Sequence, residues 1–299
     1  MLLKNVFIDL KRILRNPYFY VAFLIAAVMF LCSYGGVDPQ TGDRLMVFEL
    51  LGFRELVKDN PLMSAFELFK GVNGVGFEVF LPVIVSIPFM LIHMEEINSG
   101  MNRFIIIKEN KKRYFIGKGI SCFISGGLVS LLAYISYGIF VFLCFPGFES
   151  YSEDKMYVIN EIYGHYTSVF KAVLTDGNYL VPILILLVQM FLVGGFASMT
   201  ALLFSSFIRN IYVVICMPFF VYYTWYYLML YLGEKISVCQ IKVPALVYEF
   251  ISLTKNSCFL TGFCFPDYKI KILLFYFAIC ILQFWVYYLI SVNRTDICD

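Results

Sequence analysis

Long apolar stretches alternate with short polar ones along most of this chain. A helix that crosses a bilayer core of about 30 Å takes about 20 mostly apolar residues, and six stretches come near that length. They cover approximately residues 18–34, 75–93, 116–145, 180–208, 211–232 and 270–292. The pattern predicts an all-α polytopic membrane protein with six transmembrane helices, in which residues 1–299 form a single transmembrane domain.

Residues 2–15 have a different pattern, with apolar and charged positions on separate faces of a helix. This spacing predicts an amphipathic interfacial helix that lies in the headgroup plane. Asn16-Pro17 should end it, and proline suits the first position of the helix that follows. A cleaved signal peptide is the alternative, although its apolar core would be long and residues 32–35 make a poor cleavage site. The apolar face consists of Leu3, Val6, Phe7, Leu10, Ile13 and Leu14.

Lysine and arginine gather in alternate connections, and this asymmetry predicts the orientation in the membrane. Basic residues collect in cytoplasmic loops, so both termini are expected in the cytoplasm. The connections at about 35–74, 146–179 and 233–269 would then face outward. Within the last of these, residues 243–265 hold apolar segments too short to cross, which predicts outer re-entrant segments or a hydrophobic loop packed on the helix ends. The bases on the predicted cytoplasmic side are Lys4, Lys11, Arg12, Arg15, Arg103, Lys108, Lys111, Lys112, Arg113, Lys118, Arg209 and Arg294.

Composition supports the membrane assignment, since 61% of the residues are hydrophobic and only 15% are charged. A net charge of +2 gives no basic face for nucleic acid, so that partner class is excluded. Cys239, Cys258 and Cys264 share one predicted outer loop. Two of them could form a disulfide there, or all three could be free thiols. The other cysteines lie in or near apolar spans and are expected to act as small hydrophobes.

No motif for catalysis or nucleotide binding is found in the sequence. The phosphate-binding pattern GxxxxGK[ST] is missing, so any ATP would be bound by another chain. His93 and His165 are the only histidines, and they fall on opposite sides of the predicted membrane. Glu95-Glu96 would fit the start of the EExxxR pattern of membrane proteases, but position 100 is glycine. We therefore expect no catalytic residue, no metal and no cofactor in this chain.

Polar and aromatic residues within the predicted spans suggest a substrate path or close helix packing. Glu78 is the only acid placed inside a span, where it would either be buried at a functional site or reach the outer interface. Tyr222, Tyr223 and Trp225 could line an aromatic path, but an interfacial aromatic belt is the preferred explanation of the same cluster. Small residues spaced by four in two spans predict closely packed helices. These small residues are Gly117, Ser121 and Ser125, and Gly194 and Ser198.

The charged segment 95–113 lies between the second and third predicted spans. Residues 98–108 can form a short helix, with Asn98 or Ser99 as its cap and Met101, Phe104 and Ile105 on one apolar stripe. Such a helix suits either lipid headgroups or the groove of a partner protein. The residues alone do not separate these two alternatives.

Taken together, these features resemble the ABC-2-type permeases of bacterial ATP-binding-cassette exporters. The features are the entry helix, the six spans, the E-x-x-S-G pattern of Glu96, Ser99 and Gly100, the basic turn that leads to Lys118 and the short apolar segments before the last span. The resemblance implies that 95–113 is a cytosolic coupling segment and 2–15 a connecting helix. It also implies that 243–265 forms part of an external gate. The implied ATPase-docking residues are Glu96, Asn98, Ser99, Gly100, Met101, Arg103, Phe104 and Ile105.

By this resemblance the chain would be the non-catalytic permease subunit of an exporter in the bacterial cytoplasmic membrane. Its partners would be two ATPase subunits that carry ATP and Mg²⁺, together with a second permease chain, identical or not, and membrane lipid. The tyrosine- and phenylalanine-rich composition resembles permeases that move toxin-like or antimicrobial peptides, for export or for self-immunity. Exporters of lipid-linked polymers or drugs, and an uncoupled membrane enzyme or scaffold, are the alternatives.

Overall fold

The computed structural model describes residues 2–37, 42–71, 75–108, 110–152, 179–238 and 269–296. The protein is mostly helical. Its longer helices are α1 (Leu2–Arg15), α2 (Pro17–Leu31), α5 (Val75–Asn98), α6 (Met101–Lys108), α7 (Lys111–Cys144), α10 (Leu180–Ser205), α11 (Ile211–Val238) and α13 (Lys269–Asp296). The remaining elements are β1 (Tyr34–Val37), β2 (Arg44–Met46), α3 (Arg54–Asp59) and α4 (Ala65–Lys70), with the 3-10 helices η1 (Glu49–Gly52), η2 (Pro61–Met63) and η3 (Phe148–Ser150).

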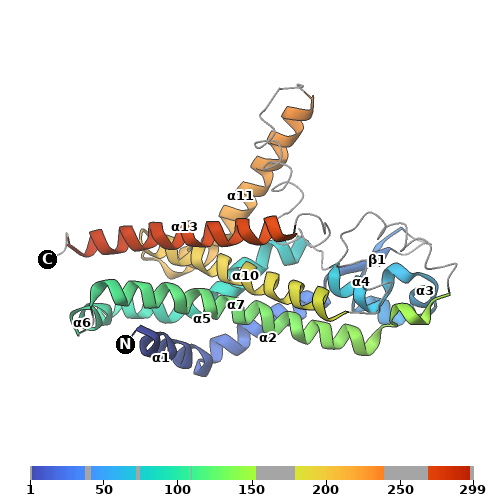
Figure 1. Ribbon diagram of the computed structural model, residues 1–299, viewed down its shortest axis with the longest axis horizontal. Helices are drawn as coiled ribbons and strands as arrows, with labels where there is room; N and C mark the ends of the chain where they lie inside the picture. Colours follow the sequence, from blue (N-terminus) through green and yellow to red (C-terminus); the bar gives the residue numbers. More distant parts are fainter. Residues whose placement is uncertain are drawn as a thin grey trace.

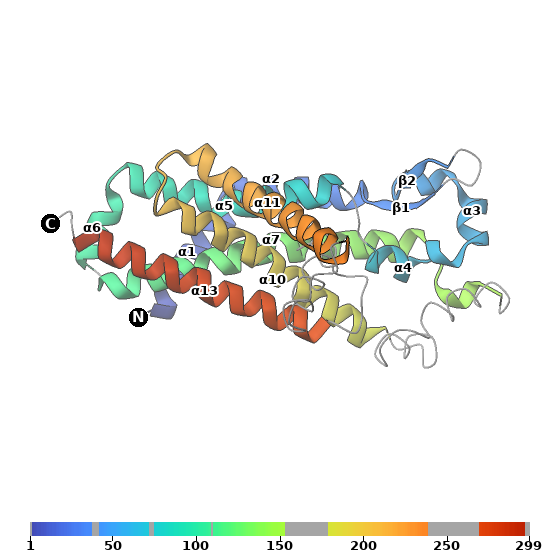
Figure 2. The same cartoon turned by 90° about the horizontal axis from the view of Figure 1, so that it is seen from above.

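Helices α2, α5, α7, α10 and α13 form an elongated bundle along the longest axis of the molecule (Figures 1 and 2). Helices α1 and α6 and the end of α13 lie at one end of the bundle, and β1, α3 and α4 lie at the other (Figure 1). Helix α11 packs on α5 and α10 through its first part and then leaves the bundle (Figure 1). The buried core follows the helix interfaces and includes Phe30, Tyr134 and Leu202.

Three helices are long and apolar enough to cross a membrane, within Phe80–Asn98, Lys111–Ser150 and Leu180–Ser205. A fourth candidate is the bent pair of α1 and α2. The apolar parts of α11 and α13 are shorter, at Ile211–Trp225 and Phe277–Asn293. The prediction of a mostly helical protein with several helices long and apolar enough to span a membrane is therefore confirmed, while the number of six spans and the side of the termini stay predictions.

The elbow between α1 and α2 follows from two adjacent residues. The side chain of Asn16 accepts a hydrogen bond from the Tyr18 amide, and Pro17 occupies the first turn of α2. Proline cannot continue the i→i−4 hydrogen bonds of α1, so the chain turns there by 68°. The bent entry into α2 was predicted from the sequence and is confirmed.

Glycines bring α7 and α10 into direct backbone contact. A Cβ atom on Gly126 would lie 2.7 Å from the carbonyl oxygen of Gly194, and one on Gly194 would lie 2.5 Å from that of Gly126. Ser130 donates to the carbonyl of Met190 at 2.9 Å across the same interface. Close packing at Gly194 and Ser198 was therefore predicted correctly. On α7 the contact is made by Gly126 and Ser130, and the predicted residues Gly117, Ser121 and Ser125 are also buried.

The end of the bundle opposite α1 carries a small folded cap where the sequence suggested only an outer loop at 35–74. Strands β1 and β2 pair antiparallel, with Tyr34 opposite Met46. Helix α4 packs on α7, where Tyr134 and Tyr137 donate hydrogen bonds to the carbonyls of Phe69 and Leu68 at 2.6 and 2.9 Å. Those tyrosines satisfy carbonyls at the end of a helix only six residues long. The contact depends on residues far apart in sequence, so a local pattern could not reveal it.

Several sequence predictions fall outside the described residues. The proposed re-entrant segments at 243–265, with Cys239, Cys258 and Cys264, belong to this group. The backbone of Glu78 lies in α5, but its side chain is not among those described. Of the cysteines in the described part, Cys122 and Cys280 are buried and Cys32, Cys144 and Cys216 are exposed, all as free thiols.

Candidate functional site

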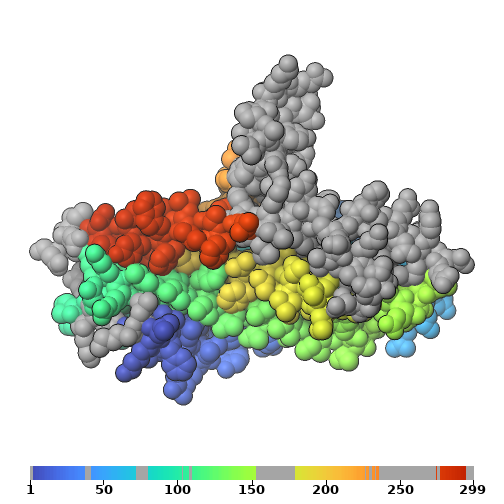
Figure 3. All heavy atoms as spheres, viewed as in Figure 1, coloured from blue at the N-terminus to red at the C-terminus, as the bar shows by residue number. Residues whose placement is uncertain are grey.

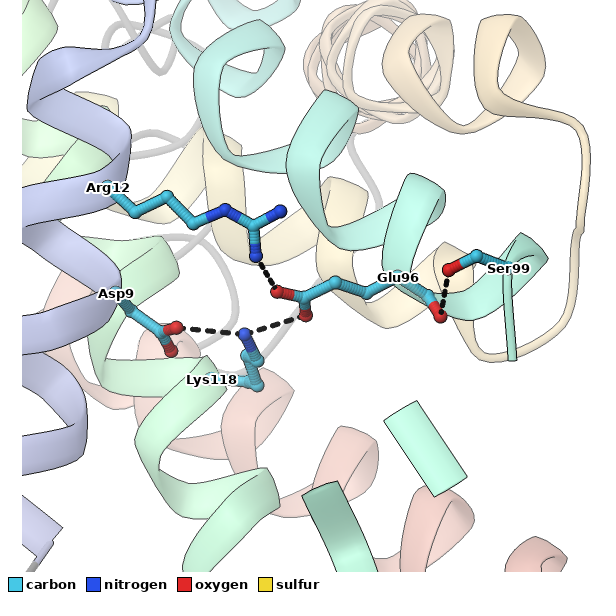
Figure 4. Close-up of polar contacts among 5 residues, drawn as sticks. All are labelled: Asp9, Arg12, Glu96, Ser99 and Lys118. Atoms are coloured by element: carbon cyan, nitrogen blue, oxygen red, sulfur yellow. Dashed lines mark hydrogen bonds and ion pairs between the residues drawn. The ribbon is translucent and has the colours of Figure 1, made fainter. Parts of the chain in front are cut away.

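Four charged side chains from three helices meet near the end of the bundle that carries α6. Asp9 and Arg12 are three residues apart on α1, Glu96 lies in the last turn of α5, and Lys118 lies two turns into α7 (Figure 4). In the sequence, Arg12 and Glu96 are 84 positions apart, and Lys118 and Asp9 are 109 apart. We call this group the ion-pair cluster.

Glu96 occupies the centre of the ion-pair cluster. One carboxylate oxygen accepts a short hydrogen bond from the Arg12 guanidinium, and the other lies 2.8 Å from the Lys118 ammonium (Figure 4). Lys118 also donates to Asp9 at 3.0 Å and lies 5.5 Å from the centre of the Tyr114 ring. Every charge in the cluster therefore has an opposite charge in direct contact.

Burial decides what these contacts are worth. The side chains of Glu96 and Lys118 are only 2% and 6% exposed, whereas those of Asp9 and Arg12 are 21% and 45% exposed. A buried charge without a partner would cost several kcal/mol, and replacing one member leaves that cost uncompensated. Two acids and two bases sum to zero charge, so the cluster as a whole is neutral. It joins α1, α5 and α7 as one unit.

The polar residues next to the ion-pair cluster do not form a metal centre. His93, one turn before Glu96, is buried and stacks on Phe89 with ring centres 5.4 Å apart. No group of three or more His, Cys, Asp or Glu side chains suited to a metal ion occurs in the described part of the chain.

Helix α5 ends in a turn that leads directly into α6. Ser99 donates to the carbonyl oxygen of Glu96 at 3.3 Å, and Gly100 has a φ of +71°, a conformation that glycine adopts without strain. Asn98 and Ser99 are exposed. Helix α6 starts at Met101, later than the predicted start at Asn98, because Gly100 separates α6 from α5.

Helix α6 presents an apolar edge to its surroundings. Met101, Phe104 and Ile107 lie at positions i, i+3 and i+6, and their exposed fractions are 46%, 76% and 83%. Ile105 turns the other way and is partly buried against the core, as is Ile106. The sequence predicted Met101, Phe104 and Ile105 as one stripe, and the structure instead places Ile107 with the first two. We call Met101, Phe104 and Ile107 the α6 edge.

The residues predicted to dock an ATPase therefore fall into different environments. Glu96 is buried and committed to Arg12 and Lys118, so its carboxylate does not face outward. Asn98, Ser99, Met101 and Phe104 are exposed, and Gly100 is half-buried in the turn. The backbone of Arg103 lies in α6, and its side chain is not among those described.

The aromatic residues of α11 do not line one surface. Tyr222 is buried and packs edge-on against Phe196 of α10, with ring centres 5.5 Å apart. Tyr223 points away, is 47% exposed and contacts Tyr227 on its own helix. Trp225 is half-buried. Tyr222 and Tyr223 therefore lie in different environments, and the aromatic path stays a prediction.

Sequence reasoning did not recognise the partners of Glu96 or the role of Ile107. One signal was available, because Lys118 lies inside the predicted span 116–145, where an ionisable residue needs a partner. Glu95, Glu96 and Glu109 all lie on the same predicted side, however, and their spacing does not single out Glu96. The contributions of Asp9 and Arg12 depend on how α1 folds back onto α5 and α7, which local spacing does not determine.

The fold and these contacts define a helical membrane protein with an internal ion-pair cluster and an exposed apolar helix edge at one end. Comparison with known proteins finds no matching family model, no matching curated protein and no matching solved structure.

Proposed function

We propose that this chain is the permease subunit of an ATP-driven exporter of the ABC-2 type and that the α6 edge docks on a separate ATPase. The observation that carries this proposal is the exposure of Met101, Phe104 and Ile107 on a short helix between two long helices. An exposed apolar helix face is a common way to engage the groove of a partner. The resemblance of the segment around Glu96, Ser99 and Gly100 to the family's coupling segment supports the same assignment.

The ion-pair cluster would convert movement of α6 into movement of the bundle. The α6 edge is connected to Glu96 by a turn of a few residues, and Glu96 is held by Arg12 on α1 and Lys118 on α7. A displacement of α6 would therefore be shared by α1, α5 and α7. In this proposal Glu96 transmits force inside the permease and does not touch the ATPase.

The proposed topology has six spans with both termini in the cytoplasm of a bacterial cell. Helices α1 and α6 and the end of α13 would lie on the cytoplasmic side, and the cap formed by β1, α3 and α4 would lie outside. Two ATPase subunits with ATP and Mg²⁺, and a second permease chain, would complete the exporter. This arrangement agrees with the grouping of basic residues near α1, α6 and the start of α7.

For the substrate we propose an amphipathic, toxin-like peptide. The support is the aromatic-rich, strongly apolar composition, with 32 phenylalanines and 22 tyrosines. Nothing in the described residues favours a lipid-linked polymer or a small drug over such a peptide. In this proposal the chain could serve either in export of the peptide or in self-immunity against it.

The docking proposal is tested by co-purification of the tagged full-length chain from its native membrane. An ATPase subunit with a Walker motif should be recovered with the wild type and lost with Phe104→Asp or Ile107→Asp, because a charge would have to be buried in the groove. Phe48→Asp is the matched control, since Phe48 is 64% exposed at the opposite end and should leave the recovery unchanged. Equal recovery from all variants would rule out docking through the α6 edge.

A further inference from the structure

The bend between α1 and α2 borders an open hollow of about 550 Å³ on the surface of the protein. Its volume falls in the range of small-molecule binding sites, which is about 300–1,000 Å³. Figure 3 shows α1 standing out from the side of the bundle. The residues that line it are Ile8, Lys11, Arg12, Arg15, Asn16 and Pro17. We call it the elbow pocket.

The elbow pocket is strongly basic. Lys11, Arg12 and Arg15 line it, and no acidic side chain does. Arg12 pairs with Glu96, whereas Lys11 and Arg15 are exposed and form no ion pair with any described residue. An anion would be bound there by charges that the protein itself leaves unused.

The exposed sides of α1 indicate the depth of the elbow pocket in a membrane. Next to its basic side the helix exposes Leu3, Phe7 and Leu14, at 80%, 66% and 38%. The opposite side, with Val6 and Ile13, is buried against the bundle. A helix with an exposed apolar sector beside a basic sector lies at the boundary between acyl chains and headgroups. The pocket is therefore at the level of lipid phosphates.

We infer that the elbow pocket binds the phosphate of an anionic phospholipid headgroup. Lys11 and Arg15 would hold the phosphate oxygens, and Ile8 and Pro17 would contact the glycerol and the first acyl methylenes. The Arg12 guanidinium has five N–H donors, so it can bind the phosphate while it remains on Glu96. Arg12 would thereby connect the bound lipid to the ion-pair cluster. This site does not depend on the proposed export function.

The test measures lipid retained by the full-length protein. The purified chain is placed in nanodiscs of phosphatidylglycerol and phosphatidylcholine, and native mass spectrometry measures the lipids that stay bound to it. The wild type should retain phosphatidylglycerol selectively. Because a basic residue near a charged lipid surface contributes about 1 kcal/mol, Lys11→Gln combined with Arg15→Gln should weaken retention on the order of 10- to 30-fold. Both side chains are exposed, so the double variant should fold normally.

A matched control distinguishes specific binding in the elbow pocket from nonspecific attraction of anionic lipid to basic residues. Lys4→Gln combined with Lys112→Gln removes the same charge from exposed residues at the same end of the molecule but outside the elbow pocket. This variant should retain phosphatidylglycerol like the wild type. Equal losses in the two double variants, or equal retention of phosphatidylcholine, would overturn the proposal. If millimolar inorganic phosphate protected the wild type against heat to the same extent as phosphatidylglycerol does, the assignment to a lipid would be overturned.

Discussion

The Lys118 ammonium lies 2.8 Å from a carboxylate oxygen of Glu96, and this contact joins the second turn of α7 to the last turn of α5. Both side chains are nearly free of solvent. Arg12 and Asp9 extend the contact to α1. Two apolar helices that could cross a membrane are thus held together by charge at the end where α6 begins.

Removing the central acid should destabilise the protein strongly. Glu96→Gln leaves Lys118 with Asp9 as its only acidic partner among the described residues, and we expect a loss of about 3 kcal/mol in the free energy of unfolding. Thermal unfolding of the detergent-solubilised chain measures it. The control is Glu95→Gln, which neutralises an exposed neighbour and should change stability by less than about 0.5 kcal/mol.

A second variant shows whether the loss comes from the unpaired lysine. Lys118→Met combined with Glu96→Gln removes both buried charges, and we expect it to recover most of the stability lost in Glu96→Gln. If the loss in the free energy of unfolding of the double variant equalled the sum of the losses in Glu96→Gln and Lys118→Met, Glu96 and Lys118 would not be energetically coupled.

The proposed topology predicts the side of the membrane on which each end of the bundle is accessible. In a background with the native cysteines replaced by alanine, Asn98→Cys and Glu55→Cys each introduce one exposed thiol, beside α6 and in the cap. A membrane-impermeant maleimide should label Glu55→Cys in intact cells, and Asn98→Cys only after permeabilisation. The reverse pattern would place α6 outside the cell, where no cytosolic ATPase could reach it.

Close contact between α7 and α10 predicts that two glycines of α7 respond oppositely to the same substitution. Gly126→Ala would place a methyl group 1.8 Å from the Ser198 hydroxyl and 2.7 Å from a backbone oxygen, so the helices must separate. We expect a loss of about 1–3 kcal/mol. At Gly117 the nearest atom is 4.0 Å away, and alanine there should be neutral or stabilising by up to about 1 kcal/mol. Thermal unfolding of both variants compares them directly.

The cap should depend on two phenol hydroxyls of α7. Tyr134→Phe removes the donor to the Phe69 carbonyl and leaves that buried oxygen without this partner, at a cost of about 1–3 kcal/mol. Because the contact is local, hydrogen exchange should accelerate in α4 more than in α10. Tyr212→Phe is the control, since Tyr212 is 78% exposed and should leave exchange unchanged.

Alkaline pH should weaken the contact between Tyr151 and the cap. Tyr151 donates to the Val57 carbonyl at 2.8 Å, and burial raises the pKa of its phenol to about 12. A pKa raised above that of the unfolded chain, about 10, means that the neutral form stabilises the fold. The stability difference between the wild type and Tyr151→Phe should therefore be constant below pH 10 and decline between pH 10 and 12. A constant difference up to pH 12 would contradict this assignment.

Much of the helical framework could be predicted from local patterns. The six predicted spans coincide with the positions of α2, α5, α7, α10, α11 and α13, because a long apolar run in helical spacing has few other structures. The break at Asn16-Pro17 was predictable for the same local reason, since proline lacks the amide that a continuing helix needs. Apolar length alone did not establish that every one of these helices spans a membrane.

The helix faces that meet were decided only by the tertiary structure. The sequence indicated an acid at Glu96, an apolar stripe near Phe104 and small residues in two spans. Folding α1 back onto α5 and α7 buried that acid between Arg12 and Lys118, and the turn at Gly100 directed Ile107 outward in place of Ile105. Helical periodicity determines which residues share a face, but the packing of several helices at once determines where that face points.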